Sequence, residues 1–136
     1  MDRITKETRS ANMRAIRSKD TGPEMKVRRL VHGMGYRYRL HRKDLPGNPD
    51  MVFPVRRAVI FVHGCFWHQH PDPACKIAHQ PKSNADYWKP KLERNQRRDA
   101  QHKAALIAQG WRVLVIWECQ IKDKDALQQR LKDFLG

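Results

Sequence analysis

Two apolar runs separated by a long helical pattern constrain the fold of this chain more than any other feature. Residues 58–64 read AVIFVHG and residues 111–118 read WRVLVIWE, and such runs are typical of buried strands. Residues 85–109 carry a helical pattern, whose regular part we expect Pro90 to confine to the later turns. Two strands joined through a helix are expected to run parallel. The carboxyl ends of both strands should therefore lie at one edge of the sheet.

A second helix is predicted ahead of these strands, over residues 21–34. Thr21 can cap it, Pro23 suits its first turn, Glu24 complements the positive helix end and Gly35 can end it. The apolar spacing agrees with a helix.

The remaining segments complete an α/β fold. YRYRL and PDMVF read as strands on either side of the turn HRKDLPGN, and residues 122–135 read as a closing amphipathic helix. A further helix is predicted over residues 5–17. The predicted order is α-α-β-β-β-α-β-α, which makes a mixed four-stranded sheet with helices on both faces.

Size and charge narrow the functional class. A chain of 136 residues fits one domain, and 28 Lys and Arg against 14 Asp and Glu leave a net charge of +14. This favours a nucleic-acid partner over mere solubility charge or an anionic membrane surface. No apolar run reaches the roughly 20 residues of a membrane span, and the first residues lack a signal-peptide pattern. We therefore expect a cytoplasmic protein that does not enter a membrane.

Cysteine and histidine residues predict a zinc site. The three cysteines form an odd set, which argues against a disulfide framework. Cys65 and Cys119 follow the two parallel strands and should meet at their shared edge, where the proline-rich loop adds His70 and Cys75. Three thiolates and one imidazole make a closed structural zinc site. The alternative is three unrelated thiols, two of them small buried hydrophobes.

A carboxylate and two imidazoles suggest phosphodiester hydrolysis. Asp50 opens a strand and can hold Mg²⁺ against a phosphate, while His63 and His68 lie outside the predicted zinc set. A neutral histidine could accept the proton of the attacking water. The alternative is that Asp50 is a turn residue and that the histidines are surface residues or spare zinc ligands.

Aromatic side chains in polar surroundings suggest contact with DNA bases. Phe66 and Trp67 are adjacent, and Trp88 and Met13 are further apolar residues among basic ones. Such side chains can stack on bases or wedge into a duplex, although they could instead seal the zinc loop. In the long helix a solvated face explains most of ERNQRRDAQHK, but three of its residues could face the site: Asn95, Arg98 and Asp99.

The sequence resembles a known family, the Vsr endonucleases of very short patch repair. The matching stretches are TRSANMRAIRSKDT, LPGNPDMVF, VIFVHGCFWHQH, ADYW, RNQRRD and GWRVLVIWEC. The resemblance implies a restriction-endonuclease-like fold in a single domain over residues 1–136. Within it, residues 1–20 would form a DNA-binding helix or arm, and residues 21–136 the catalytic core.

The resemblance also implies an activity. Such enzymes nick one DNA strand 5′ to the thymine of a T:G mismatch, which arises when 5-methylcytosine deaminates. The catalytic residues would be Asp50 on Mg²⁺, Glu24 acting on the metal through water, and His63 and His68, with His68 as the general base. The backbone carbonyl of Val62 would also bind Mg²⁺. The zinc ligands would be Cys65, His70, Cys75 and Cys119, and the DNA-binding residues Met13, Phe66, Trp67, Trp88, Asn95 and Arg98.

Two departures from the family pattern stand out. Val62 replaces a threonine, which matters only if the hydroxyl is used, and the spacing from His70 to Cys75 is longer than expected. The alternatives are a nuclease of the same fold with another trigger and a zinc-stabilised DNA-binding protein without catalysis. We expect a monomer near the bacterial nucleoid, with mismatch-repair proteins and a DNA polymerase as possible partners.

Overall fold

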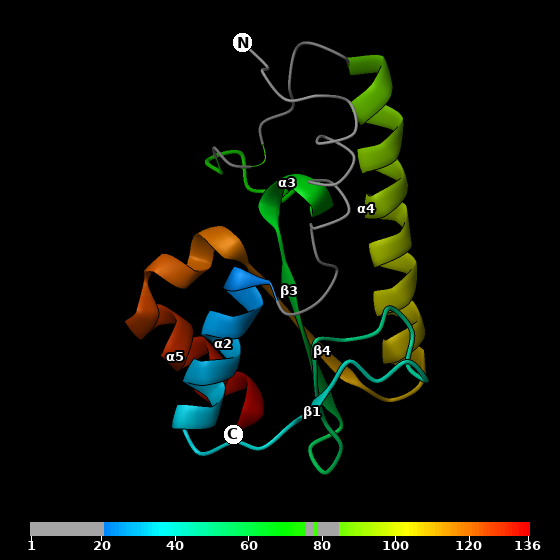
Figure 1. Cartoon of the computed structure of the whole chain (residues 1–136). Helices are drawn as coiled ribbons and strands as arrows, with labels where there is room; N and C mark the ends of the chain where they lie inside the picture. The colour runs from blue at the N-terminus through cyan, green and yellow to red at the C-terminus, as the bar shows by residue number, and fades with distance from the viewer. Residues whose placement is uncertain (1–20, 76–77, 79–84) are drawn as a thin grey trace, which may run out of the picture.

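A four-stranded sheet with the order β1-β2-β3-β4 organises the computed structural model, which describes residues 21–75, 78 and 85–136. The strands are β1 (Arg39–Leu40), β2 (Met51–Phe53), β3 (Ala58–His63) and β4 (Arg112–Trp117). The helices are α2 (Gly22–Gly33), α3 (Cys65–His68), α4 (Ala85–Ala108), the 3₁₀ helix η1 (Glu118–Lys122) and α5 (Lys124–Leu135). Figure 1 shows α2 and α5 on one side of the sheet and α4 on the other.

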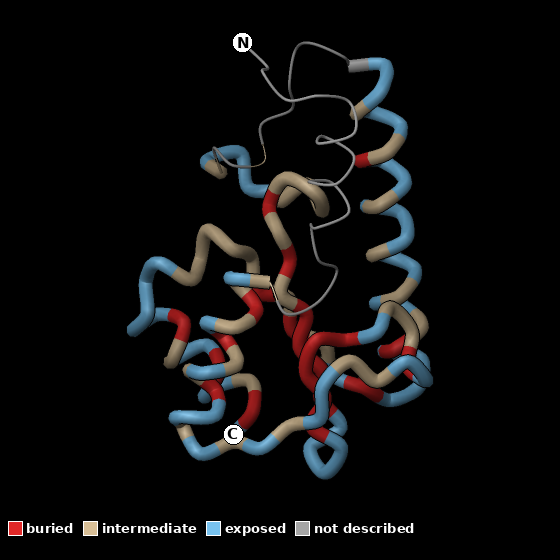
Figure 2. Tube along the Cα trace, in the orientation of Figure 1, coloured by how far each residue is buried: buried red, intermediate tan, exposed pale blue. Residues whose placement is uncertain are grey.

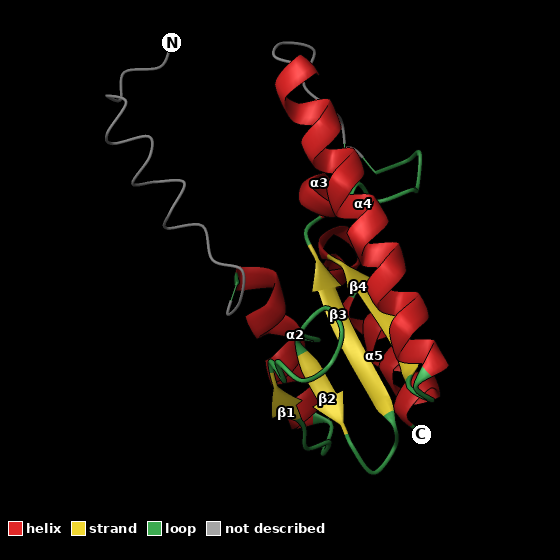
Figure 3. Ribbon diagram, turned by 90° about the vertical axis from the view of Figure 1, so that its right-hand side faces the viewer, coloured by secondary structure: helices red, strands yellow, loops and turns green. Residues whose placement is uncertain are grey.

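The strand directions confirm the predicted mixed sheet. β1 and β2 pair antiparallel, as do β2 and β3, whereas β3 and β4 pair parallel from Ala58↔Arg112 to His63↔Trp117. Because β3 and β4 run in the same direction, both of their carboxyl ends lie at one edge (Figure 3). α3 follows directly from β3, and η1 follows directly from β4.

Alternating side chains of the strands fill two cores, one on each face of the sheet. Ile60 packs with Val27 and Val31 of α2 and with the apolar side of α5. Its neighbours Val59 and Phe61 point the other way and pack with Leu106 of α4. Figure 2 shows the buried residues gathered along β2 and β3. The predicted helices on both faces are confirmed.

The structure corrects several predicted boundaries. The strand predicted for YRYRL is reduced to Arg39–Leu40, and the next strand begins at Met51 rather than Pro49. The prediction that Pro90 confines the regular part of α4 to later turns is wrong, because the helix starts at Ala85. Pro90 removes only the bond to the carbonyl of Asp86, which lies in an exposed first turn that water can reach.

The predicted helix over residues 5–17, the predicted arm over residues 1–20 and Met13 lie outside the described residues. Within the described part of the chain, no helix has the length and apolar character needed to cross a membrane.

Candidate active site and metal centre

A cleft of about 740 Å³ opens at the edge where β3 ends. Its wall includes His41, Asp50, Val62, His63, His68 and Asp99. A neighbouring cavity of about 640 Å³ shares Asp50, His68 and Asp99 with it and extends to Glu24, Trp67 and Arg98. The structure therefore brings the predicted catalytic residues, which come from three elements and a loop, to one place.

Asp50 is held at the bottom of this cleft by the backbone of β3. Its Oδ2 accepts a hydrogen bond from the N–H of Val62 at 2.6 Å, and the residue is only 9% exposed. Burial raises the pKa of Asp50 to about 8, with the nearby Glu24 carboxylate adding to the rise and the Val62 N–H opposing it. A bound cation would favour the ionised form of such a carboxyl. The prediction that the Val62 carbonyl binds metal stays a prediction.

Glu24 reaches the same place from the first turn of α2. The Oγ1 of Thr21 caps this helix by accepting from the N–H of Glu24 at 3.3 Å. The Glu24 carboxylate is buried, and its Oε2 lies 3.3 Å from Nη1 of Arg28 and 2.9 Å from Nε2 of His41. Glu24, His41 and Asp50 each place a ligand-type atom within 4.8 Å of the others.

Three further groups lie together on the cleft wall. The rings of His63 and His68 stack with centroids 3.9 Å apart and planes 8° apart. Nδ1 of His68 lies 2.6 Å from Oδ2 of Asp99 on α4. A carboxylate at this distance stabilises the Nδ1–H tautomer and leaves Nε2 as the basic atom. Asp99 therefore has a closer tie to the catalytic residues than Asn95 or Arg98.

His63 is buried and, at neutral pH, uncharged. Burial lowers the pKa of His63 to about 4, with the neighbouring His68 adding to the effect. Its Nδ1 has no hydrogen-bond partner among the described residues, although this atom is buried. Buried polar atoms without a hydrogen-bond partner are rare in proteins overall, and those that occur are often found at functional sites.

The aromatic residues predicted to contact DNA form one cluster above the cleft. Phe66 and Trp67 of α3 and Trp88 of α4 meet edge to face in pairs, with centroids 5.2, 5.5 and 5.7 Å apart. All three are half-buried. The ammonium of Lys91 lies 6.0 Å from the ring centre of Trp67. The cluster is thus accessible and borders a cation.

Two polar residues predicted to bind DNA, Asn95 and Arg98, make hydrogen bonds at the junction of α3 and α4. Nδ2 of Asn95 donates to the carbonyl of Trp67 at 3.1 Å, and Nη2 of Arg98 donates to Oδ1 of Asn95 at 2.9 Å. The first bond links α4 to α3, and the second lies within α4. They leave the remaining guanidinium N–H groups of Arg98, which borders the second cavity, for other partners.

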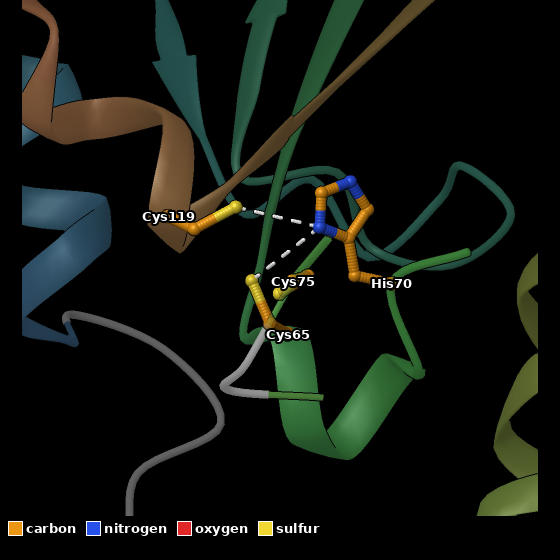
Figure 4. Close-up of side chains that lie close together, drawn as sticks. All are labelled: Cys65, His70, Cys75 and Cys119. Carbon is orange, nitrogen blue, oxygen red and sulfur yellow. Dashed lines mark hydrogen bonds between the residues drawn. The ribbon is translucent and has the colours of Figure 1, made fainter. Parts of the chain in front are cut away.

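The four predicted zinc ligands converge beside the cleft (Figure 4). Nδ1 of His70 lies 3.8 Å from Sγ of Cys65 and 3.4 Å from Sγ of Cys119. Tetrahedral zinc with its usual bond lengths would set such sulfur and nitrogen atoms about 3.6 Å apart. Cys75 completes the set, with all four ligand atoms within 4.8 Å of one another. The donor set and its spacing fit a zinc ion.

Burial makes the clustered thiols less acidic. Burial raises the pKa of the Cys65 thiol to about 12 and raises that of Cys119 as well. Thiols packed together in this way become thiolates when a metal ion binds, because the ion supplies the missing positive charge.

The longer spacing between His70 and Cys75 is absorbed by a local turn. Oδ1 of Asp72 accepts from the N–H of Ala74 at 2.9 Å, and the carbonyl of Asp72 accepts from the N–H of Cys75 at 3.0 Å. This turn directs Cys75 back to the cluster, so the departure from the family pattern leaves the ligand set intact.

Sequence reasoning missed His41, which it treated as the start of a turn. No periodicity marks this residue, and only its nearness in space to Glu24 and Asp50 shows its place. Asp99 was considered among polar residues of a helical face. Its four-residue distance from Asn95 was the available signal, because residues four apart share one face of a helix.

Several known DNA endonucleases and nicking enzymes are similar to this chain. A family model described as DNA mismatch endonuclease Vsr matches residues 1–74. The nicking enzyme V.XorIIP of Xanthomonas oryzae is 56% identical over 134 residues, covering 98% of this chain and 96% of that protein. DNA mismatch endonuclease Vsr of Escherichia coli is 39% identical, covering 96% of this chain and 85% of that protein.

A solved structure supports the fold alone. The catalytic domain of homing endonuclease I-Bth0305I superimposes with a TM-score of 0.56 at 21% identity, covering 85% of this chain and 94% of that one. The mixed sheet, the flanking helices and this likeness confirm the restriction-endonuclease-like fold expected from the sequence.

Proposed function

Because this chain belongs to the DNA mismatch endonuclease Vsr family, we propose that it nicks one strand of duplex DNA immediately 5′ to the thymine of a T:G mismatch. Such mismatches arise by deamination of 5-methylcytosine, and the nick would begin short patch repair. The observation that carries the proposal is the meeting of a buried carboxylate pair and a His63–His68–Asp99 chain in one cleft.

The carboxylate pair fits a divalent cation. Asp50 and Glu24 bring oxygen ligands of the kind that Mg²⁺ prefers, and the two buried carboxylates are unfavourable without added positive charge. When bound, such an ion neutralises the scissile phosphate and acidifies water. Asp50 would be the direct ligand, together with the Val62 carbonyl, and Glu24 would act through water.

His68 is proposed as the general base. Its Nδ1 is engaged by Asp99, so Nε2 is the atom that can accept a proton from water. Asp99 keeps the ring oriented and stabilises the positive charge that develops on it. His63 stacks on this ring and is neutral at pH 7, so it can hydrogen-bond the phosphate or the departing oxygen without carrying a charge.

The aromatic cluster is proposed to recognise the mismatch. A T:G pair stacks and pairs less stably than a matched pair, so wedging side chains into the duplex costs less there. Phe66, Trp67 and Trp88 lie together at the exposed side of α3 and α4. Zinc bound by Cys65 and His70 at the two ends of this short segment would keep it rigid during insertion.

The overall charge of +14 would hold the DNA backbone through phosphate contacts, with Met13 supporting the wedge from the N-terminal arm. One active site suffices to nick one strand, so we propose a monomer. We also propose a cytoplasmic, nucleoid-associated location, with mismatch-repair proteins and a DNA polymerase acting after the nick.

A nicking assay tests this function. Zinc-loaded protein with Mg²⁺ is incubated with T:G and fully matched duplexes of the same sequence, each labelled on one strand, and product is mapped to the nucleotide. The proposal expects cleavage only 5′ to the mismatched thymine. Cleavage of matched DNA at one sequence would indicate a nuclease with another trigger, and binding without cleavage would indicate a DNA-binding protein.

A further inference from the structure

A half-buried histidine, His41, lies close to both carboxylates of the proposed metal site. His41 directly follows β1, and its backbone has a positive φ of 49°. L-residues with side chains rarely adopt this left-handed conformation, and non-glycine residues that do so are concentrated at functional positions. Its side chain is only 17% exposed. The chain thus bends here in a way that directs the imidazole inward.

The ring spans the gap between the carboxylates. Nε2 lies 2.9 Å from Oε2 of Glu24, an ion-pair distance at which the two groups are not aligned as a hydrogen bond, and Nδ1 lies 4.0 Å from Oδ1 of Asp50. The same Oε2 of Glu24 lies 3.3 Å from Nη1 of Arg28, one turn along α2. Glu24 is therefore held from two directions, by its own helix and by the segment that follows β1.

This arrangement bears on how the Glu24 carboxylate is kept beside Asp50. Two buried carboxylates close together repel each other, and Glu24 has rotatable bonds that would let it turn away. Arg28 alone, four residues along the same helix, draws the carboxylate along α2. His41 contacts the Glu24 carboxylate from a different element, on the segment that follows β1, and lies between it and Asp50.

We propose that His41 is a positioning residue, which through the close contact of its Nε2 with the Glu24 carboxylate keeps Glu24 beside Asp50 and so sets the affinity of this site for a divalent cation. The inference rests on the proposed function, because it takes the two carboxylates as the cation site. His41 touches neither the phosphate nor the attacking water in this role. Partners that orient metal ligands typically change metal affinity by about 10–100-fold when removed.

Two substitutions separate the effect of the contact between His41 and Glu24 from the effect of the backbone conformation at residue 41. His41→Asn keeps a residue that tolerates left-handed φ, but its amide ends short of the Nε2 position. His41→Gln has a longer side chain, whose amide can reach Glu24 and donate a hydrogen bond. His32→Ala is the matched control, since His32 is exposed on α2 outside the cluster.

The experiment measures Mn²⁺ binding to zinc-loaded, full-length protein without DNA, from the loss of the free-ion electron paramagnetic resonance signal. His41→Asn is expected to raise the Kd for Mn²⁺ by about 10–100-fold, while His41→Gln and His32→Ala stay within about threefold of the parent protein. Thermal unfolding of each variant reports whether the fold is kept.

Parent-like binding of Mn²⁺ by His41→Asn would overturn the inference. An equal loss of Mn²⁺ affinity in His41→Gln would also overturn it, because the contact between this side chain and Glu24 would then be irrelevant. Asp50→Ala separates this failure from failure of the proposed function. If Asp50→Ala also binds Mn²⁺ like the parent protein, the carboxylates are not the cation site. If it loses binding while His41→Asn does not, only the role of His41 is wrong.

Discussion

Two clusters of ligand-type residues lie at the same edge of the sheet and differ in almost every physical respect. The cysteine cluster combines three thiols with His70, and its measured separations match a closed tetrahedral site with no place for a substrate. The carboxylate cluster consists of Glu24, His41 and Asp50 and opens onto a cleft of about 740 Å³.

This difference predicts a structural role for the cysteine cluster and a chemical role for the carboxylate cluster. The cysteine cluster brings α3, which follows β3, together with η1, which follows β4, so a zinc ion bound there would link these two segments at the sheet edge. The cleft beside it contains the groups whose pKa values depart from the ordinary range in opposite directions, Asp50 upward and His63 downward. Such opposed environments are typical of sites that assign acid and base roles.

Removing Asp50, the proposed metal ligand of the carboxylate cluster, should have the largest effect on activity. Asp50→Ala is expected to lower the nicking rate on T:G duplex by roughly 10⁴-fold or more, because a metal ion contributes several kcal/mol to such a reaction. Zinc content and duplex binding should be kept. The check is single-turnover nicking with a gel-shift titration, and parent-like nicking would refute the assignment.

Removing the proposed general base, His68, should have the next largest effect on the nicking rate. His68→Ala is expected to lose about 10²–10⁴-fold in rate. Asp99→Asn should lose less, about 10–100-fold, because it disturbs only the orientation and tautomer of His68. Single-turnover rates at saturating Mg²⁺ measure both. If Asp99→Asn were as active as the parent protein, the bond of 2.6 Å to His68 would have no catalytic role.

The closed cluster should respond in stability and metal content instead. Cys119→Ser is expected to lower bound zinc and the thermal midpoint together, because metal binding is coupled to the order of the segment it joins. Elemental analysis and a melting curve on the same sample measure the two. A full equivalent of zinc in this variant would show that Cys119 is not a ligand and would erase the contrast between the clusters.

The aromatic cluster should affect selectivity more than rate. Trp67→Ala is expected to reduce the preference for T:G over matched duplex by roughly 5- to 150-fold, since base stacking is worth about 1–3 kcal/mol per base. Competition binding of the two duplexes measures this preference. Replacing Lys91 by Ala serves as a control, because removing a cation should weaken both duplexes alike. Equal loss on both duplexes for Trp67→Ala would make it a packing residue.

The smallest expected effect is a pH dependence of stability. The pKa of His63 is about 4 in the folded protein, below the ordinary value of 6.5, so the unfolded chain binds more protons between these values. The contribution of His63 to the free energy of unfolding, measured as the difference between the parent protein and a variant without this imidazole, should therefore fall by about 2 kcal/mol from pH 7 to pH 5.

A non-titrating variant, His63→Asn, should lose this contribution. Denaturant unfolding without Mg²⁺ at both pH values provides the comparison. An unchanged pH dependence in His63→Asn would mean that His63 is not the neutral buried group described here. Asp50 contributes with the opposite sign, because its raised pKa makes the folded state bind more protons, so both proteins should be measured with Asp50 intact.

The sheet, and the edge where β3 and β4 end, could be predicted from the sequence because they depend on local patterns. Apolar runs at residues 58–64 and 111–118 indicated the parallel pair, and Cys65 and Cys119 follow these runs directly. Their meeting needed no knowledge of side-chain packing. The sequence also predicted that Asp50 opens a strand, and the structure places Asp50 directly before β2, on the wall of the cleft.

The helix at Pro90 shows where a local rule was too strict. Proline disfavours a helix through a missing N–H and a steric clash, but this cost is reduced in the first turns. Only the exposed position of Asp86, which the tertiary structure sets, shows that the freed carbonyl can be satisfied by water.

The partners of the catalytic residues were decided by the tertiary structure. His41 meets Glu24 and Asp50, and Asp99 meets His68, across distances in the chain that no periodic pattern reports. A pattern in sequence records which face of an element is apolar, because burial repeats with the element's own period. It does not record which polar side chains on different elements come within hydrogen-bond distance, since that depends on how the elements pack against one another.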